Sequence, residues 1–96
     1  MMDNEQLVAR IQGGDSEAEN MLELWKQNKG FIAMIARRYS AGAEMEDLEQ
    51  EGYIALCEAV QHYDLDRGKS FIGYAAFYIK RRMRICADNS RTVRLS

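Results

Sequence analysis

Residues 70–94 read SFIGYAAFYIKRRMRICADNSRTVR, and their spacing predicts one long helix over about residues 70–88. At about 100° per residue, one side of this helix carries an apolar stripe that is typical of a core face: Ile72, Ala75, Ala76, Ile79, Met83 and Cys86. The other side interleaves rings with guanidinium groups: Tyr74, Phe77, Tyr78, Arg81 and Arg84. Rings stack on unpaired bases and cations follow phosphates, so this composition indicates a surface for unstacked nucleic acid. Composition alone leaves open a second interpretation, in which the rings pack under another layer and the arginines are solvated.

Length and composition predict a single helical domain. The chain has 96 residues, 47% of them hydrophobic, and no proline, which favours helices throughout. We therefore expect an all-α fold, a compact bundle of about four to five helices. No apolar run approaches the roughly 20 residues of a membrane span. Cys57 and Cys86 are isolated in the sequence, which is typical of reduced thiols in a cytoplasmic protein.

The net charge of −2 conceals a strong asymmetry along the chain. Residues 1–66 carry five basic and fourteen acidic side chains, whereas residues 67–96 carry eight basic side chains and one acidic side chain. This division indicates two different partners, one of them a polyanion. The alternative is that the two halves attract each other, but the positive charge shares its segment with the rings.

Upstream of the basic segment, apolar spacing predicts several further helices. Leu7, Val8 and Ile11 predict a short helix over residues 4–12, which Gly13 and Gly14 end. Apolar residues then continue to about residue 39, with Gly30 as either a break or a tolerated position inside one longer helix. Together these helices form an N-terminal unit over residues 1–40, followed by a turn over residues 40–44.

The next helix is predicted over residues 45–62. Its buried side is expected to consist of Leu48, Gly52, Ala55, Leu56 and Ala59. Tyr53 and Ile54 would then be exposed beside Gln50 and Glu51, a mixture of apolar and acidic groups that is typical of a protein-binding face. Part of the acidity has a structural explanation as well, because carboxylates near a helix start favour the helix dipole.

No catalytic, metal-binding or cofactor-binding pattern is present in the sequence. His62 is the only histidine, and its position near a helix end explains it without a ligand role. The turn Asp64–Gly68, DLDRG, lacks the spacing of a calcium loop. We therefore expect a protein that is not an enzyme and that uses no cofactor or metal.

Several motifs in combination resemble region 2 of the bacterial sigma-70 family. They are LVARIQGGD at residues 7–15, IARRY at residues 35–39, DLEQEGYIAL at residues 47–56, and then Ala59–Val60, Tyr63–Asp64, Arg67–Gly68, Phe71, Tyr74–Ala75 and Ile79–Lys80. The closing RTVRL at residues 91–95 resembles the point at which that domain leads into the next. The resemblance covers nearly the whole chain.

The resemblance implies two binding faces. Asp47, Gln50, Glu51 and Tyr53 match positions that dock on the coiled coil of the largest-subunit clamp of RNA polymerase, and Ile54 and Cys57 complete this predicted polymerase-binding set. Phe71, Tyr74, Phe77 and Tyr78 match rings that open the promoter −10 element and hold its non-template strand. Lys69, Lys80, Arg81 and Arg84 would accompany them as cations near the DNA.

Four departures from the family pattern predict an alternative or divergent sigma factor rather than a primary one. Phe77–Tyr78 stands in place of a tryptophan pair, Arg81 in place of glutamine and Lys69 in place of a ring, and residues 83–89 are one residue short. Residues 89–96 are expected to begin a linker to an absent C-terminal domain. The alternative function is a stand-alone helical regulator that binds single-stranded nucleic acid or an anti-sigma factor without polymerase.

Overall fold

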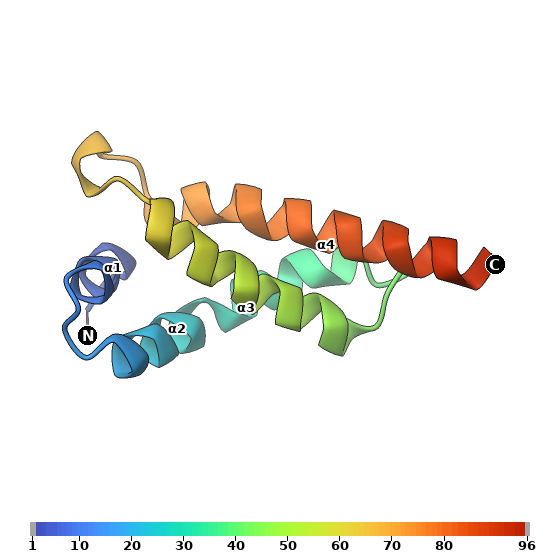
Figure 1. Cartoon of the computed structure of the whole chain (residues 1–96), viewed down its shortest axis with the longest axis horizontal. Helices are drawn as coiled ribbons and strands as arrows, with labels where there is room; N and C mark the ends of the chain where they lie inside the picture. The colour runs from blue at the N-terminus through green and yellow to red at the C-terminus, as the bar shows by residue number, and fades with distance from the viewer. Residues whose placement is uncertain (1, 96) are drawn as a thin grey trace.

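Four α-helices and one short 3₁₀ turn form the computed structural model, which describes the backbone of residues 2–95 and the side chains of residues 2–89. They are α1 (Asn4–Gln12), α2 (Glu17–Arg38), α3 (Met45–His62), the 3₁₀ turn Leu65–Arg67 and α4 (Phe71–Leu95). Figure 1 shows α4 lying along α3, with α2 passing behind α3 and α1 seen end-on near the N-terminus. The expected all-α bundle is confirmed.

Local sequence signals set the start and end of α1. The Asp3 carboxylate accepts a hydrogen bond from the Gln6 backbone N–H at 2.8 Å, and the Gln6 side chain accepts one from the Asp3 N–H at 2.9 Å. This reciprocal pair is a capping box, which satisfies two donors at the helix start. Gly13 follows the helix, and Gly14 adopts a left-handed conformation with φ of 77°, so the chain can turn into α2.

Helix α3 contacts all three other helices, and its buried side forms part of the core. Leu48, Gly52, Ala55, Leu56 and Ala59 are all buried, as their spacing predicts. On α4 the buried residues are Phe71, Ala75, Ile79, Met83 and Ala87, whereas Ile72, Ala76 and Cys86 are only partly buried. The helix is therefore rotated slightly from the predicted setting, because Phe71 and not Ile72 enters the core.

Two glycines in helix interiors have opposite environments, and this predicts opposite effects of alanine. A Cβ on Gly52 would lie 2.6 Å from Ile32 Cγ2 and 3.1 Å from Met83 Cε, whereas a Cβ on Gly30 would meet nothing within 4 Å. We expect Gly30→Ala to stabilise the fold by about 0.5–1 kcal/mol through helix propensity. Gly52→Ala should instead destabilise it by about 1 kcal/mol, because overpacking typically costs about 1–3 kcal/mol and exceeds the same gain.

Urea unfolding followed by circular dichroism would measure both changes. Equal stabilisation by the two substitutions would show that α2, α3 and α4 do not approach closely at Gly52.

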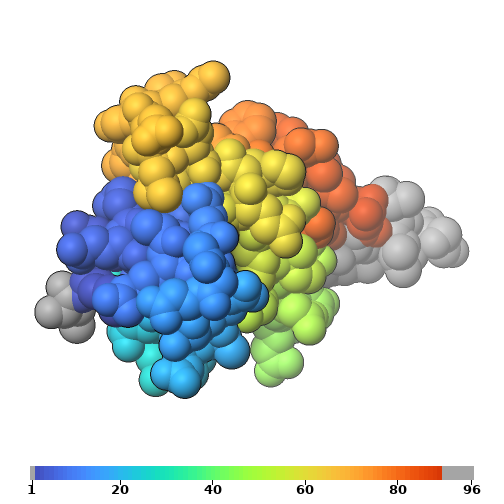
Figure 2. All heavy atoms as spheres, turned by 60° about the vertical axis from the view of Figure 1, so that its left-hand side comes forward, coloured from blue at the N-terminus to red at the C-terminus, as the bar shows by residue number. Residues whose placement is uncertain are grey.

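The turn between α3 and α4 is anchored at both ends. The Tyr63 hydroxyl donates to the Lys69 carbonyl, and the Asp64 carboxylate accepts from the Asp66 backbone N–H at 2.9 Å. Figure 2 shows this turn, residues 63–70, as a projection above α1. At the start of α4, the Glu5 carboxylate accepts a hydrogen bond from the Phe71 backbone N–H at 2.7 Å. A side chain of α1 thus caps the start of α4.

Helix α4 continues beyond the predicted end at Asp88. It runs to Leu95, so residues 89–95 are helical. The assignment of residues 89–96 as the start of a linker stays a prediction. The last turns of α4 project past the other helices in Figure 1. Ser96 lies outside the described residues.

Candidate nucleic-acid interface

A continuous series of rings runs from the end of α3 along the first half of α4. Tyr63 contacts Tyr74, Tyr74 contacts Tyr78, and Tyr78 contacts Phe77, with centroid separations of 5.6, 5.3 and 6.0 Å. These separations lie within the range of favourable ring pairs. The last ring, Phe77, is 66% exposed, which is unusual for so large an apolar side chain in a small domain. We name Tyr74, Phe77 and Tyr78 the ring face.

Hydrogen bonds hold two of the three rings in place. The Tyr74 and Tyr78 hydroxyls lie 3.0 Å apart, and the Tyr74 hydroxyl donates to the His62 carbonyl at 3.3 Å. The bond to Tyr78, together with burial, raises the pKa of the Tyr74 hydroxyl. The His62 ring lies parallel to Tyr78 with a centroid separation of 6.3 Å. Tyr74 and Tyr78 are therefore held in place before any ligand binds.

Two hollows open beside these rings. One, of about 400 Å³, is lined by Lys69, Ser70, Gly73, Tyr74, Phe77 and Tyr78. The other, of about 360 Å³, is lined by His62, Tyr63, Asp64, Arg67, Lys69 and Tyr74. Tyr74 and Lys69 line both hollows, so the two hollows are adjacent and share one ring and one cation. Such sites suit flat heterocycles that carry a phosphate nearby.

Phe71 does not belong to this surface, which corrects its assignment as a DNA-binding ring. Its side chain is fully buried and meets Tyr63 edge-on, with ring centroids 5.3 Å apart. Sequence spacing does not distinguish Phe71 from Tyr74, because residues three apart lie on the same side of a helix. The packing of α1 and α3 against the start of α4 places Phe71 inside.

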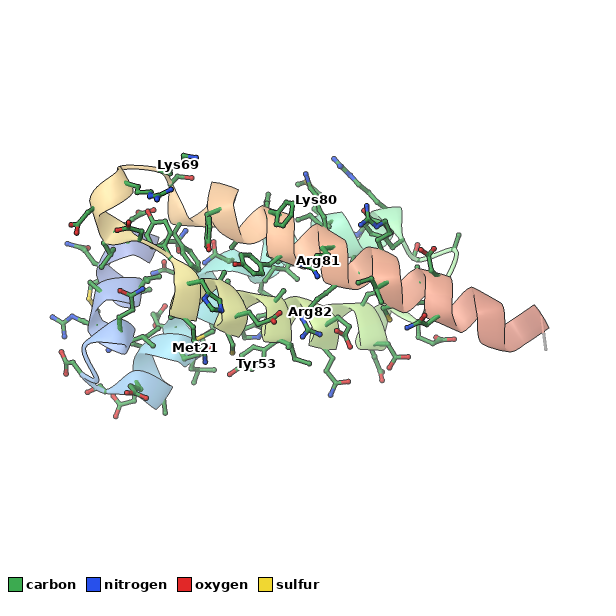
Figure 3. All side chains as sticks on the ribbon, turned by 45° about the horizontal axis from the view of Figure 1, so that its top comes forward. Met21, Tyr53, Lys69, Lys80, Arg81 and Arg82 are labelled. Atoms are coloured by element: carbon green, nitrogen blue, oxygen red, sulfur yellow. The ribbon has the colours of Figure 1, made fainter. Side chains whose placement is uncertain are left out.

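The predicted cations remain available around the ring face. Lys69, Lys80, Arg81 and Arg84 are all exposed, and none of them forms an ion pair within residues 2–89. Figure 3 shows Lys69 at the turn that leads into α4, with Lys80 and Arg81 further along the helix. Cations without a carboxylate partner are suited to phosphates, because no ion pair must be broken first.

Arg82 differs from these cations in forming ion pairs, a role that sequence reasoning missed. Its Nη1 lies 2.8 Å from Glu51 Oε1 and its Nε lies 2.5 Å from Glu58 Oε1, so it joins α4 to α3. Figure 3 shows Arg82 between the two helices. Glu51, predicted to face a partner protein, is therefore already bound within the domain. Only the antiparallel packing of α3 and α4 brings these residues together, so no local pattern could reveal it.

The Arg82 hydrogen bond lowers the pKa of the Glu58 carboxyl, which predicts a pH dependence. A carboxyl with a lowered folded pKa stabilises the fold above its unfolded pKa of about 4.3 and loses that stabilisation as pH falls through the folded value. We expect Glu58→Gln to be less stable than the parent at pH 7 by no more than about 1 kcal/mol, because the pair is partly exposed. The difference should shrink between about pH 4.5 and pH 3 in urea titrations. A difference independent of pH would contradict the pairing.

A second face lies on α3 and includes a residue of α2. Asp47 and Gln50 are exposed, as are Tyr53 and Ile54, while Glu51 and Cys57 are partly buried. Trp25 of α2 packs edge-on against Tyr53 at a centroid separation of 5.4 Å, a contact that periodicity did not predict. Burial raises the pKa of the Cys57 thiol, which favours its protonated form. The face combines carboxylates with an aromatic pair.

Within the described residues no group of histidine, cysteine and carboxylate side chains is placed to hold a metal ion. A search of the same residues found no helix with the length and apolar character needed to cross a membrane.

Comparisons with known proteins converge on one family. Residues 24–90 match the family model described as Sigma-70 region 2. The chain is 37% identical over 91 residues to RNA polymerase sigma factor SigA of Listeria monocytogenes and to that of Listeria innocua, and 37% identical over 95 residues to that of a Bacillus species. The first two alignments cover 93% of this chain and 24% of the relative, and the third covers 97% and 25%. The chain thus spans about a quarter of the length of these relatives. No solved structure matches it significantly.

Proposed function

This chain belongs to the sigma-70 family, and we therefore propose that it serves transcription initiation by docking on RNA polymerase and holding one strand of opened promoter DNA. Its SigA relatives are RNA polymerase sigma factors by name. In this proposal α3 meets the clamp coiled coil of the largest polymerase subunit through Asp47, Gln50, Tyr53, Ile54 and Cys57. The ring face of α4 captures the non-template strand of the −10 element, and both events take place in the cytoplasm.

The observation that carries the proposal is the exposed ring of Phe77 at the edge of a hollow that Lys69 also lines, with Lys80, Arg81 and Arg84 exposed further along α4. A base can stack on such a ring only after it leaves the duplex, and A·T-rich steps need the least energy to open. Binding energy from the captured bases and from the phosphates near Lys69, Lys80, Arg81 and Arg84 then offsets the cost of melting. No covalent step is involved.

The polymerase-binding half of the proposal predicts that a charge at Ile54 disrupts docking. Ile54 is 37% exposed on α3, and Leu65 in the 3₁₀ turn is similarly exposed, at 39%, so the two offer a matched pair. Ile54→Asp should weaken binding to a Bacillus core polymerase by about tenfold, since it places an unpaired charge in the contact. Leu65→Asp should have little effect on this affinity.

Affinities of labelled protein for core polymerase, measured by fluorescence anisotropy, test this prediction. Equal affinities for the parent chain and Ile54→Asp would reject this docking face. If the parent chain bound A·T-rich single strands but showed no affinity for core polymerase, the alternative of a regulator that acts without polymerase would replace the proposal.

A further inference from the structure

Arg82 connects α4, which carries the ring face, to α3, which carries the proposed polymerase-binding face. Glu58 and His62 are four residues apart on α3, and Tyr78 and Arg82 are four residues apart on α4. Residues with this spacing lie on the same side of a helix. His62 stacks on Tyr78 and Glu58 binds Arg82, so two adjacent cross-helix contacts hold the same stretch of α4. Glu51, two helical turns before Glu58 on α3, adds a third contact.

Among the described residues Arg82 forms both ion pairs at this edge of α3, while Arg81 and His62 add weaker charge interactions with Glu58. Glu51 and Glu58 are separated by two helical turns, and both use one guanidinium, through Nη1 and Nε respectively. The three side chains are between 31% and 40% exposed, so water screens the pairs only in part. Without Arg82, the Glu51 and Glu58 carboxylates would face α4 without an ion-pair partner, and α4 would lose these two ion pairs to α3.

We propose that Arg82 is a positioning residue for strand capture: through Glu51 and Glu58 it fixes the register of α4 on α3 and thereby the placement of Tyr78. It contacts neither polymerase nor DNA in this role. The inference rests on the proposed function, since it concerns the same ring face. It also changes the role of Glu51, which acts on the ring face through Arg82.

Charge removal separates positioning from direct contact with DNA. The double variant Glu51→Gln, Glu58→Gln removes two negative charges near the DNA face while leaving Arg82 in place. If Arg82 contacts phosphate directly, this variant should bind DNA equally well or more tightly, because repulsion falls and the guanidinium is released. If Arg82 positions Tyr78, the variant should bind more weakly despite the loss of repulsion.

The experiment measures the affinity of the chain, bound to core polymerase, for an A·T-rich single-stranded oligonucleotide. We expect Glu51→Gln, Glu58→Gln and, separately, Arg82→Met each to weaken binding by about 3- to 10-fold, the range expected from two partly screened ion pairs. The control Glu46→Gln, Glu49→Gln removes the same charge from α3 and should not weaken binding. Unchanged or tighter binding by Glu51→Gln, Glu58→Gln would overturn the proposal.

Hydrogen exchange on the free chain gives a readout that needs neither partner. Amides of residues 74–82 should exchange faster in Arg82→Met and in Glu51→Gln, Glu58→Gln than in the parent or the Glu46→Gln, Glu49→Gln control. Unchanged exchange would reject the register role even if DNA binding fell. If the parent chain failed to bind the oligonucleotide, the proposed function would fail, while faster exchange would still support Arg82 as the residue that sets the register.

Discussion

Replacing Phe71 with alanine is expected to lower the free energy of unfolding by about 3–5 kcal/mol, the usual cost of removing a buried phenylalanine side chain. The Phe71 ring is fully buried, and it packs edge-on against Tyr63, which itself supports Tyr74. The substitution therefore leaves a cavity beneath the start of α4. Any loss of DNA binding in this variant should follow from lost folding rather than from a lost contact.

Urea unfolding and strand binding, measured on the same samples, would test this expectation. Phe71→Leu retains an apolar side chain and should cost about 1–1.5 kcal/mol while leaving DNA affinity nearly unchanged. If Phe71→Leu were stable and yet lost DNA binding, Phe71 would be a contact residue, and its burial would not describe the bound state.

Phe77→Ala should produce the opposite pattern, a large loss of single-strand affinity with little change in stability. Stacking of a base on a protein ring contributes about 1–3 kcal/mol, so affinity should fall by roughly 5- to 150-fold. The unfolding free energy should change by no more than about 0.5 kcal/mol, because Phe77 is largely exposed and makes one ring contact, with Tyr78, within the described residues.

Fluorescence anisotropy with an A·T-rich single strand, in the presence of core polymerase, would measure this effect. Phe77→Tyr keeps a ring and should retain most of the affinity, while Leu22→Ala removes another exposed apolar group, from α2, and should have no effect on DNA affinity. Equal loss in Phe77→Ala and Leu22→Ala would mean that the ring face has no special role.

The helices were predictable because their signals are local. The bounds of α1 and of α3 were predicted correctly, since apolar spacing, two glycines and a short polar turn mark their ends. Gly30 proved to be tolerated inside α2, where a side chain would meet nothing. The end of α4 was not predicted, because the helix continues past Asp88 through residues whose pattern resembled a linker.

The candidate site was only partly predictable, because its details depend on packing between helices. The spacing placed Tyr74, Phe77 and Tyr78 on one side of α4, and the structure brings these three together. The spacing could not show that Phe71 enters the core, that Glu5 caps α4, or that Trp25 packs on Tyr53. Nor could it separate Arg82 from its exposed neighbours, since the carboxylates that bind Arg82 lie on another helix. The expectation of a divergent rather than a primary sigma factor stays a prediction.

Photocrosslinking from position 77 tests the central proposal most directly. A photoreactive phenylalanine analogue at Phe77, in the chain bound to core polymerase on an A·T-rich promoter fragment, should crosslink to bases of the opened non-template strand. The same analogue at Leu22 should give no crosslink to DNA. Crosslinks from position 77 to protein alone, or equal DNA labelling from both positions, would contradict strand capture by the ring face.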